Sequence, residues 1–450
     1  MLVGTHNKFP VMKKYVLVLL LQFFAAFLFA QSRPNFIIIY VDDLGYGDLG
    51  ITGHPTIRTP NLDRMAQEGM RFTNYYSASP ACTASRYALL TGKYPPRSGF
   101  AWVLGPLSEK GIHPKERLLP EYLKEAGYRT AIFGKWHLGS VKASYLPTAN
   151  GFDEFVGFPY SNDMIPPKYP DIALLQGTDT LEMNPDQSKL TKLYTEKAID
   201  YIDRNKKHPF FVYLPYAMPH TPLFPGKDFA GTSKRGKYGD VVEELDHYIG
   251  QLLSYLKKEK LDKKTYVIFT SDNGPWLIQN ENGGSAGLFR DGKGSTWEGG
   301  MRVPFLLWGH ESLPKGTVVN EVFTALDILP TLGGIAGVDQ LANPIDGKGL
   351  GNLFKNEEQG REIFFYFGAK HELYAVRKGK WKLHVKTSSQ LNIDYFGGTL
   401  PLLFDLEQDP SEKYNVAADH NNIVEELQKL ILQKKEEIQK EGSFWDSAHE

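Results

Sequence analysis

The sequence predicts an α/β fold with a mixed, mostly parallel central sheet sandwiched by helices, and a smaller C-terminal α+β unit. Three observations support this: short apolar runs typical of strands buried on both faces, helical patterns between them, and a change of character near residue 361. The expected parallel strands are residues 36–41, 130–133, 210–214, 265–270 and 304–308. A chain of 450 residues, 42% of them apolar, can bury such a core.

The segments between the apolar runs carry helix signals. Residues 60–68 follow Thr59, a candidate N-cap, and stop before Gly69. In residues 241–256, apolar side chains recur on one helical face. A third helix is expected at residues 83–91. Strands that alternate with helices in this way are typical of a doubly wound sheet.

The sequence after residue 360 predicts a different kind of unit. It shows runs typical of antiparallel strands, followed by a polar helix. These elements are expected at residues 362–367, 373–385, 401–409 and 423–440. We therefore predict a catalytic domain at 31–360 and an α+β subdomain at 361–450. Residues 160–186 and 274–300 resemble long loops, which often carry function on a rigid scaffold.

The N-terminal segment is typical of a secretory signal peptide. Residues 1–30 contain a positive flank at Lys13 and Lys14, followed by an apolar run shorter than the ~20 residues that span a membrane. We predict cleavage after Ala30 and export to the periplasm or the cell exterior. A retained membrane anchor is the alternative, and Met12 is a second candidate start.

The net charge and the cysteine content limit the classes of function that the sequence allows. A formal net charge of -1 gives no field that would attract nucleic acid or a membrane surface, so any anion site must be built from a few local residues. The chain holds one cysteine, Cys82, so no internal disulfide can form, although export usually goes with disulfides. A leftover cysteine in an exported protein is either buried filler or a chemically used thiol.

Two expected strands run directly into pairs of oxygen-bearing side chains. Asp42 and Asp43 follow residues 36–41, and Asp272 and Asn273 follow residues 265–270. The carboxyl ends of parallel strands share one sheet edge, so the pairs can meet if the chain turns at once, which nearby glycines permit. Carboxylates packed so closely need a cation to stay ionised, and an all-oxygen site suits Ca²⁺ somewhat better than Mg²⁺. The alternative is that these acids cap helices or begin turns.

Cys82 stands at the start of a predicted helix. Free N–H groups and the helix dipole there favour an anion and lower the pKa of a thiol. Arg86, four residues on, would lie on the same helical face. This combination suits a tetrahedral oxyanion. On spacing alone, a cysteine hydrolase with His137 or His220 as its base is the competing interpretation.

Five sequence blocks then resemble the sulfatase family, in that family's order. They are VDDLGYGDLG, CTASR followed by LLTG, GYRTAIFGKWHLG, SDNG and GKGSTWEGGMRVP. CTASR matches the signature C-x-P/A-x-R, with Ala84 where most members have proline. The resemblance covers roughly residues 33 to 420. It implies a formylglycine-dependent type I sulfatase similar to arylsulfatase A, with an alkaline-phosphatase-like fold.

The resemblance implies that Cys82 is a precursor. In the family this cysteine is oxidised to formylglycine, whose hydrated gem-diol attacks the sulfur of a sulfate monoester in line. A disulfide at Cys82 would block that conversion, which accounts for a lone cysteine in an exported chain. The partners implied are a sulfated small molecule or glycan, and a maturation enzyme that makes formylglycine.

The resemblance also implies roles for the matched residues. The metal ligands would be Asp42, Asp43, Asp272 and Asn273, with an oxygen of the modified Cys82. Arg86 and Lys135 would hold the nucleophile and the metal-bound oxygens. His137 would deprotonate the second hydroxyl, lying on the same side of an extended chain as Lys135. His220 would contact the sulfate and protonate the leaving oxygen, and Lys293 would bind the sulfate and share that acid role. Lys135 and, from a weaker match, Ser161 would also bind the substrate.

Two other functions stay open on the sequence. One is a phosphonate or phosphate monoester hydrolase, since related folds share the metal site. The other is a catalytically silent protein that binds sulfated glycans. Aryl sulfates are a further candidate substrate beside sulfated carbohydrates.

Overall fold

The computed structural model describes residues 33–100, 102–338, 340–341, 344–357 and 359–446. The predicted signal peptide at 1–30 lies outside these residues. Within them, no helix combines the length and the apolar character that a membrane crossing requires.

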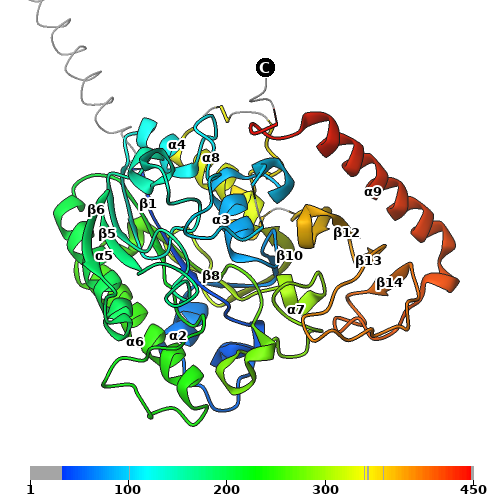
Figure 1. Ribbon diagram of the computed structural model, residues 1–450, viewed down its shortest axis with the longest axis horizontal. Coiled ribbons are helices and arrows are strands. Elements are labelled where there is room, and N and C mark those ends of the chain that lie inside the picture. The colour runs from blue at the N-terminus through cyan, green and yellow to red at the C-terminus, as the bar shows by residue number, and fades with distance from the viewer. Residues whose placement is uncertain (1–32, 101, 339, 342–343, 358, 447–450) are drawn as a thin grey trace, which may run out of the picture.

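A ten-stranded mixed sheet forms the centre of the protein (Figure 1), in the order β10-β2-β9-β8-β1-β7-β3-β4-β5-β6. The strands are β1 (Asn35–Val41), β2 (Met70–Tyr76), β3 (Arg129–Phe133), β4 (Glu154–Gly157), β5 (Ala173–Gln176), β6 (Asp179–Met183), β7 (Phe210–Pro215), β8 (Thr265–Ser271), β9 (Phe305–Gly309) and β10 (Thr317–Thr324). The inner strands β8, β1, β7 and β3 are mutually parallel, as expected. The expectation for residues 304–308 was wrong in direction, because β9 runs antiparallel to both β8 and β2.

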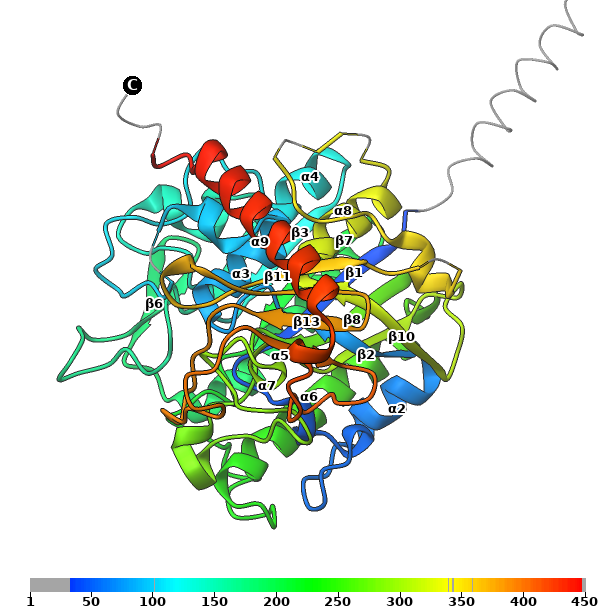
Figure 2. The ribbon, with the colours of Figure 1, turned by 90° about the vertical axis from the view of Figure 1, so that its right-hand side faces the viewer.

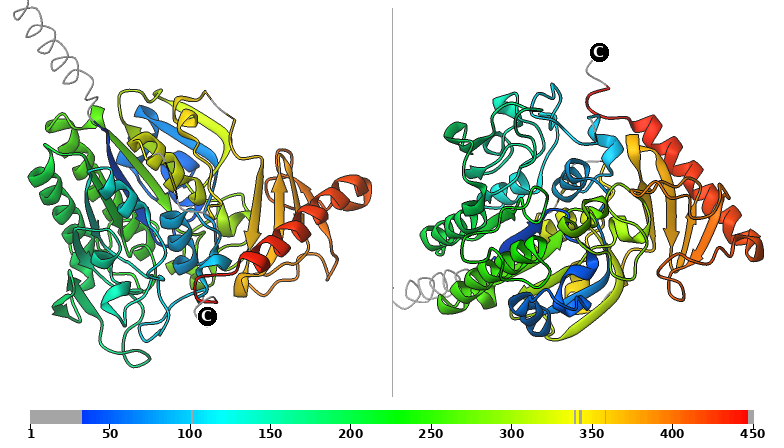
Figure 3. Two further views of the ribbon diagram at one scale, coloured as in Figure 1. Left: turned by 90° about the horizontal axis from the view of Figure 1, so that it is seen from above. Right: turned by 60° about the horizontal axis from the view of Figure 1, so that its bottom comes forward.

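Helices cover both faces of this sheet. They are α2 (Pro60–Glu68), α3 (Cys82–Thr91), α4 (Leu119–Glu125), α5 (Leu190–Asn205), α6 (Lys237–Lys258), α7 (Glu298–Met301) and α8 (Ala325–Ala336). Strand β1 shows why two layers form: Ile38 and Tyr40 point into one apolar cluster, while Ile37 and Ile39 point into the other. Helices α3, α4 and α8 complete the first cluster, and α2, α5 and α6 complete the second. The expected sandwich of helices about a mixed sheet is therefore confirmed, and Figure 3 shows it from two further sides.

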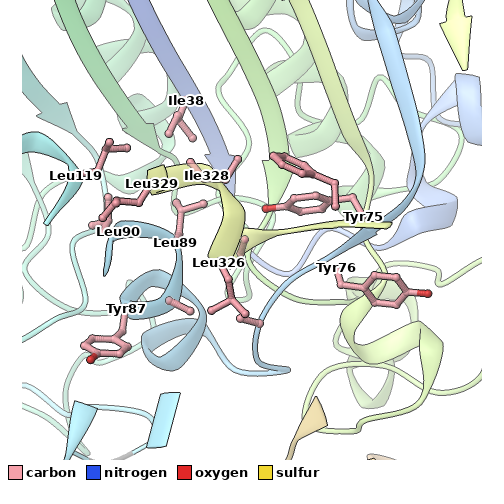
Figure 4. Packing of buried hydrophobic residues seen from close by; sticks show 14 of the residues in the cluster. Ile38, Tyr75, Tyr76, Tyr87, Leu89, Leu90, Leu119, Leu326, Ile328 and Leu329 are labelled. Atoms are coloured by element: carbon pink, nitrogen blue, oxygen red, sulfur yellow. The ribbon is translucent and has the colours of Figure 1, made fainter. Parts of the chain in front are cut away.

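Helix α3 is held in the interior by α8. Leu89 and Leu90 of α3 pack near Leu326 and Leu329 of α8 and Ile38 of β1, and all five side chains are fully buried (Figure 4). Every residue of α3 is buried, including its single charged side chain. Because α3 is packed on all sides, the position of its first residue, Cys82, is fixed by the surrounding core.

The C-terminal unit contains a four-stranded antiparallel sheet, as predicted. It is formed by β11 (Ile363–Phe367), β12 (Leu373–Lys378), β13 (Trp381–His384) and β14 (Leu402–Asp405). Helix α9 (Asn421–Glu441) lies across it (Figure 2) and buries Leu427 and Ile431. The division of the chain at residues 360 and 361 stays a prediction.

Two local expectations were only partly right. Residues 160–186 are not all loop, because β5 and β6 pair within them as an antiparallel hairpin. Thr59 is the N-cap residue of α2, but its side chain bonds Gly50 N and Asp63 and caps nothing. The cap is instead Asp246 of α6, whose Oδ1 accepts from the N–H groups of Asn61 and Leu62 at 3.0 and 2.8 Å. A tertiary contact thus replaces the local one.

Candidate active site

The two strand ends that carry acids lie side by side. Strands β1 and β8 pair in parallel with Val41 opposite Ser271, so the residues that follow meet at one edge of the sheet. Asp43 N donates to Asp272 Oδ1 at 3.1 Å, and Asn273 Nδ2 donates to Asp43 Oδ1 at 2.7 Å. All four side chains, Asp42 included, are buried.

The turn after β1 is made by an aspartate and not by the neighbouring glycines. Asp43 itself has φ 63°, in the left-handed region that aspartate tolerates better than most residues. The glycines instead permit close packing: a Cβ on Gly45 would lie 2.2 Å from Ser285 O, and one on Gly274 would lie 1.8 Å from Gly299 O. The segment 274–300 can therefore close over the strand ends.

Cys82 is the first residue of α3 and lies at this cluster. One ligand atom each from Asp42, Cys82 and Asp272 can be chosen so that all lie within 4.8 Å of one another. The expectation that the helix start lowers the pKa of the thiol was wrong. Burial, reinforced by the negative charges of Asp42 and Asp272, raises its pKa above the usual value despite Lys135 and Lys293.

Two buried cations complete the inner part of the site. Arg86 donates from Nη2 to Asp272 Oδ2 at 2.8 Å, and from Nη1 to Lys135 O at 3.1 Å. Lys135 Nζ donates to Asp42 Oδ2 and, at 3.0 Å, to Ser161 Oγ. Ser161 therefore lies behind Lys135, where its hydroxyl holds the ammonium group toward Asp42.

The electrostatics of this cluster favour a further cation. Burial opposes ionisation of Asp42, but Lys135, His220 and Arg86 outweigh it and lower its pKa. Burial and the charge of Asp42 raise the pKa of Asp272, so Arg86 alone does not offset the crowding of carboxylates.

Oxygen atoms suited to a cation are also available. Asp42 Oδ1 and Asn273 Oδ1 are buried and have no hydrogen-bond partner among the described residues. Buried oxygens in that condition are costly unless a ligand meets them. Together with the carboxylates of Asp43 and Asp272, they fit a hard divalent ion.

His137 lies near Lys135 and Arg86, as expected, but the backbone conformation that places it there is not the expected one. It has φ 62°, so the chain from Lys135 is not extended there. Its Nε2 donates to Leu104 O at 2.8 Å, which leaves the lone pair on Nδ1, and this buried Nδ1 has no partner among the described residues. Burial and the charges of Lys135 and Arg86 lower its pKa well below the usual value, so the ring is neutral and can accept a proton.

His220 and Lys293 approach the cluster from its outer side. Lys293 Nζ lies 2.7 Å from Asp43 Oδ2, and His220 Nε2 lies 3.6 Å from the same oxygen. His220 Nδ1 donates to Thr221 O at 2.5 Å, so Nε2 is the nitrogen that faces the site. Burial and the charge of Lys293 lower the pKa of His220. The Lys293 side chain is 14% exposed, against none for Arg86 and Lys135, so it borders the entrance.

Comparison with known proteins identifies the family. The profile of the sulfatase family matches residues 34–338, which is more than half of the chain. This chain belongs to the sulfatase family. A second profile, the C-terminal region of aryl-sulfatase, matches residues 359–449 and so extends past residue 420, where the resemblance read from the sequence ends. The protein is therefore a sulfuric ester hydrolase.

Curated relatives of this sulfatase carry two names. It is 38% identical to mouse N-acetylgalactosamine-6-sulfatase over 430 residues, which cover 86% of this chain and 82% of the relative. It is also 38% identical to bovine arylsulfatase A, covering 91% of this chain and 88% of that one.

Solved structures show the same architecture. The PsFucS1 sulfatase from a Pseudoalteromonas species matches with a TM-score of 0.82 and 28% identity, covering 96% of this chain and 95% of the other. The phosphonate monoester hydrolase of Agrobacterium radiobacter matches with a TM-score of 0.62 and 19% identity, covering 90% and 96%, and shows the fold alone.

The sequence did not reveal two residues that support the outer part of the sulfatase site. The ring of Trp276 lies 4.5 Å from Lys293 Nζ and 5.2 Å from the His220 ring. Gln390, between β13 and β14, donates from Nε2 to Lys293 O at 2.7 Å and accepts at Oε1 from Ile278 N at 3.2 Å. Trp276 follows the SDNG block closely, a position that could have drawn attention. Gln390 carries no local signal, because only the tertiary fold brings the C-terminal unit to Lys293.

Proposed function

We propose that this sulfatase is exported and hydrolyses sulfate monoesters of carbohydrates, with aryl sulfates as further substrates. The observation that carries the proposal is the set of cationic and histidine side chains that surround the acidic strand ends beside Cys82. Arg86, Lys135 and Lys293 each contact an aspartate of that cluster. The relatives named N-acetylgalactosamine-6-sulfatase support a sulfated sugar as the substrate. The signal-like residues 1–30 support export.

We propose Ca²⁺ as the metal, with Mg²⁺ as the less favoured alternative. Asp42, Asp43, Asp272 and Asn273 would hold it, together with an oxygen of the modified Cys82. The support is the donor chemistry and the two buried oxygens without partners, Asp42 Oδ1 and Asn273 Oδ1. When bound, the ion would act as a Lewis acid that draws electron density from a sulfate oxygen and favours ionisation of the nucleophile.

We also propose that a maturation enzyme oxidises Cys82 to formylglycine, whose hydrated form supplies the attacking hydroxyl. The CTASR motif supports this modification. Because Cys82 is 2% exposed, the enzyme would need access to the chain before α3 is packed.

The other side chains would bind the sulfate and move protons. Lys135 and Lys293 would bind sulfate oxygens, with Ser161 holding Lys135, and Arg86 would steady the nucleophile. His137 would take a proton at Nδ1, the nitrogen without a partner. His220 would contact the sulfate through Nε2. With the anionic substrate beside it, the ring would be protonated at Nε2 and give that proton to the leaving oxygen, a task that Lys293 could share.

The test is a panel of esters offered to protein made in a host that forms formylglycine. It contains N-acetylgalactosamine 6-sulfate, other sulfated mono- and disaccharides, an aryl sulfate, and the phosphate and phosphonate esters of the same phenol. We expect sulfate release from at least one sugar, and slower cleavage of the phosphorus esters. Faster phosphate or phosphonate cleavage would favour the ester hydrolase alternative. Binding without any turnover, with an unmodified Cys82 in protein from its native host, would favour the glycan-binding alternative.

A further inference from the structure

A cavity of about 490 Å³ lies next to the outer part of the site. Two of its lining residues are chain neighbours of site residues. Thr221, which lines the cavity, follows His220 directly, and Asp163, which also lines it, lies two residues after Ser161. Its volume falls within the range of roughly 300–1,000 Å³ that is usual for small-molecule sites.

Trp276 connects this cavity to the candidate chemistry. Its indole lines the cavity, and the same ring contacts His220 at 5.2 Å and lies 4.5 Å from Lys293 Nζ. The side chain is half-buried, so part of its surface is accessible. A group whose sulfate met His220 and Lys293 would therefore extend along Trp276 and into the cavity.

Four polar side chains that line the cavity have no hydrogen-bond or ion-pair partner among the described residues. They are Asp163, Lys237, Gln279 and Asn282. Asp163 Oδ1 is buried and lacks a partner there. Phe224 adds an apolar surface to the lining. An aromatic surface beside several available donors and acceptors matches a ligand that has an apolar face and many hydroxyls.

We propose that this cavity is the subsite for the alcohol part of the substrate, a single neutral pyranose ring, with Trp276 packing against its C–H face. Asp163, Gln279 and Asn282 hydrogen-bond its hydroxyls. The one acid and the one lysine of the lining balance in formal charge, which favours a neutral sugar over a uronic acid or a multiply sulfated ring. This inference rests on the proposed function and adds to it the chemical class of the group that leaves.

The first experiment compares two substrates of the active enzyme, N-acetylgalactosamine 6-sulfate and a small aryl sulfate. For Gln279→Ala and Asn282→Ala, we expect the ratio of the sugar kcat/KM to the aryl kcat/KM to fall about three- to ten-fold, the loss of one hydrogen bond each. For Trp276→Leu we expect a fall of about ten-fold or more, and Trp276→Phe should restore most of the ratio. Gln251→Ala, at an exposed glutamine of α6, is the matched control.

A ratio that stays within two-fold in all cavity variants overturns the inference and leaves the sulfatase proposal intact. The same conclusion follows if the wild-type enzyme cleaves the aryl sulfate but none of the sulfated sugars. If the wild-type enzyme cleaves neither substrate, the proposed function fails, and a binding measurement decides the inference separately.

That binding measurement uses Cys82→Ala protein and the change of tryptophan fluorescence on adding N-acetylgalactosamine 6-sulfate. We expect saturable binding, and a Kd at least about five-fold weaker when Asn282→Ala is added. The fluorescence change should be lost with Trp276→Phe while binding, followed by calorimetry, persists. An unchanged Kd in the Asn282→Ala background contradicts the subsite.

Discussion

Arg86 Nη2 lies 2.8 Å from Asp272 Oδ2, and both side chains are fully buried. The first belongs to α3, which begins at Cys82, and the second follows β8. The ion pair thus joins the helix of the lone cysteine to the end of the sheet that carries the acids. Arg86 also lies 3.4 Å from Asp42 Oδ2, so one guanidinium faces both strand ends.

We expect Arg86→Met to lower the free energy of unfolding by about 3–5 kcal/mol, because it leaves two buried carboxylates without this cation. Urea unfolding at neutral pH measures the change. Arg58→Met is the control: Arg58 is 73% exposed in its pair with Glu243, and its loss should cost about 1 kcal/mol or less. Equal losses of unfolding free energy in the two variants would show that burial does not determine how much the Arg86 ion pair contributes to stability.

Cys82→Ala should fold and unfold cooperatively but release no sulfate above background. The substitution removes the small buried group at the end of the residue 82 side chain from a packed helix, so we expect a stability loss of about 1–2 kcal/mol. Sulfate release and thermal unfolding are measured on the same preparation. Turnover by this variant would disprove the role of Cys82. Mass spectrometry of the wild-type peptide should show an aldehyde in place of the thiol.

Asp272→Ala should lose the bound metal, since it removes a carboxylate at the junction of both strand ends. Metal content is measured by atomic emission after dialysis against metal-free buffer, with wild-type protein alongside. Asp240→Ala removes a buried acid whose carboxylate, among the described residues, accepts only from Gly231 N and Ser233 N, and it should retain the metal. An unchanged calcium content in Asp272→Ala would count against the proposed ligand set.

Glu244 lies outside the active site, and its buried carboxyl group should make the stability of the protein depend on pH. This side chain is 1% exposed, accepts one hydrogen bond from Gly226 N, and has no cation beside it among the described residues. Burial raises its pKa from 4.5 to about 7. Between these values the folded protein binds a proton that the unfolded chain has lost, so the contribution of Glu244 to stability falls as pH rises from 4.5 to 7.

Glu244→Gln does not titrate and keeps a similar shape. We expect the stability of the wild-type protein relative to this variant to fall by on the order of 2–3 kcal/mol between pH 5 and pH 8. Chemical denaturation at the two pH values gives the difference. A difference that is constant with pH, or that grows in favour of the wild type, contradicts the raised pKa.

The sequence alone predicted the elements whose signals are local. Strands buried on both faces need continuous apolar runs, so β1, β3, β7 and β8 were visible as such. The acids that follow β1 and β8 were equally visible, because the ends of parallel strands share one edge. Five blocks in family order then indicated the sulfatase family, which the comparisons confirm.

The tertiary structure decided the relations between segments that are distant in the sequence. The direction of β9 depends on its partners β2 and β8, since an apolar run looks the same in either direction. The cap of α2 comes from Asp246, the turn after β1 from Asp43, and the pKa of Cys82 is raised because burial outweighs the helix start. Trp276 and Gln390 meet Lys293 only after the chain has folded. Residue type and spacing determine which groups are present, whereas desolvation and contacts across the fold determine what those groups can do.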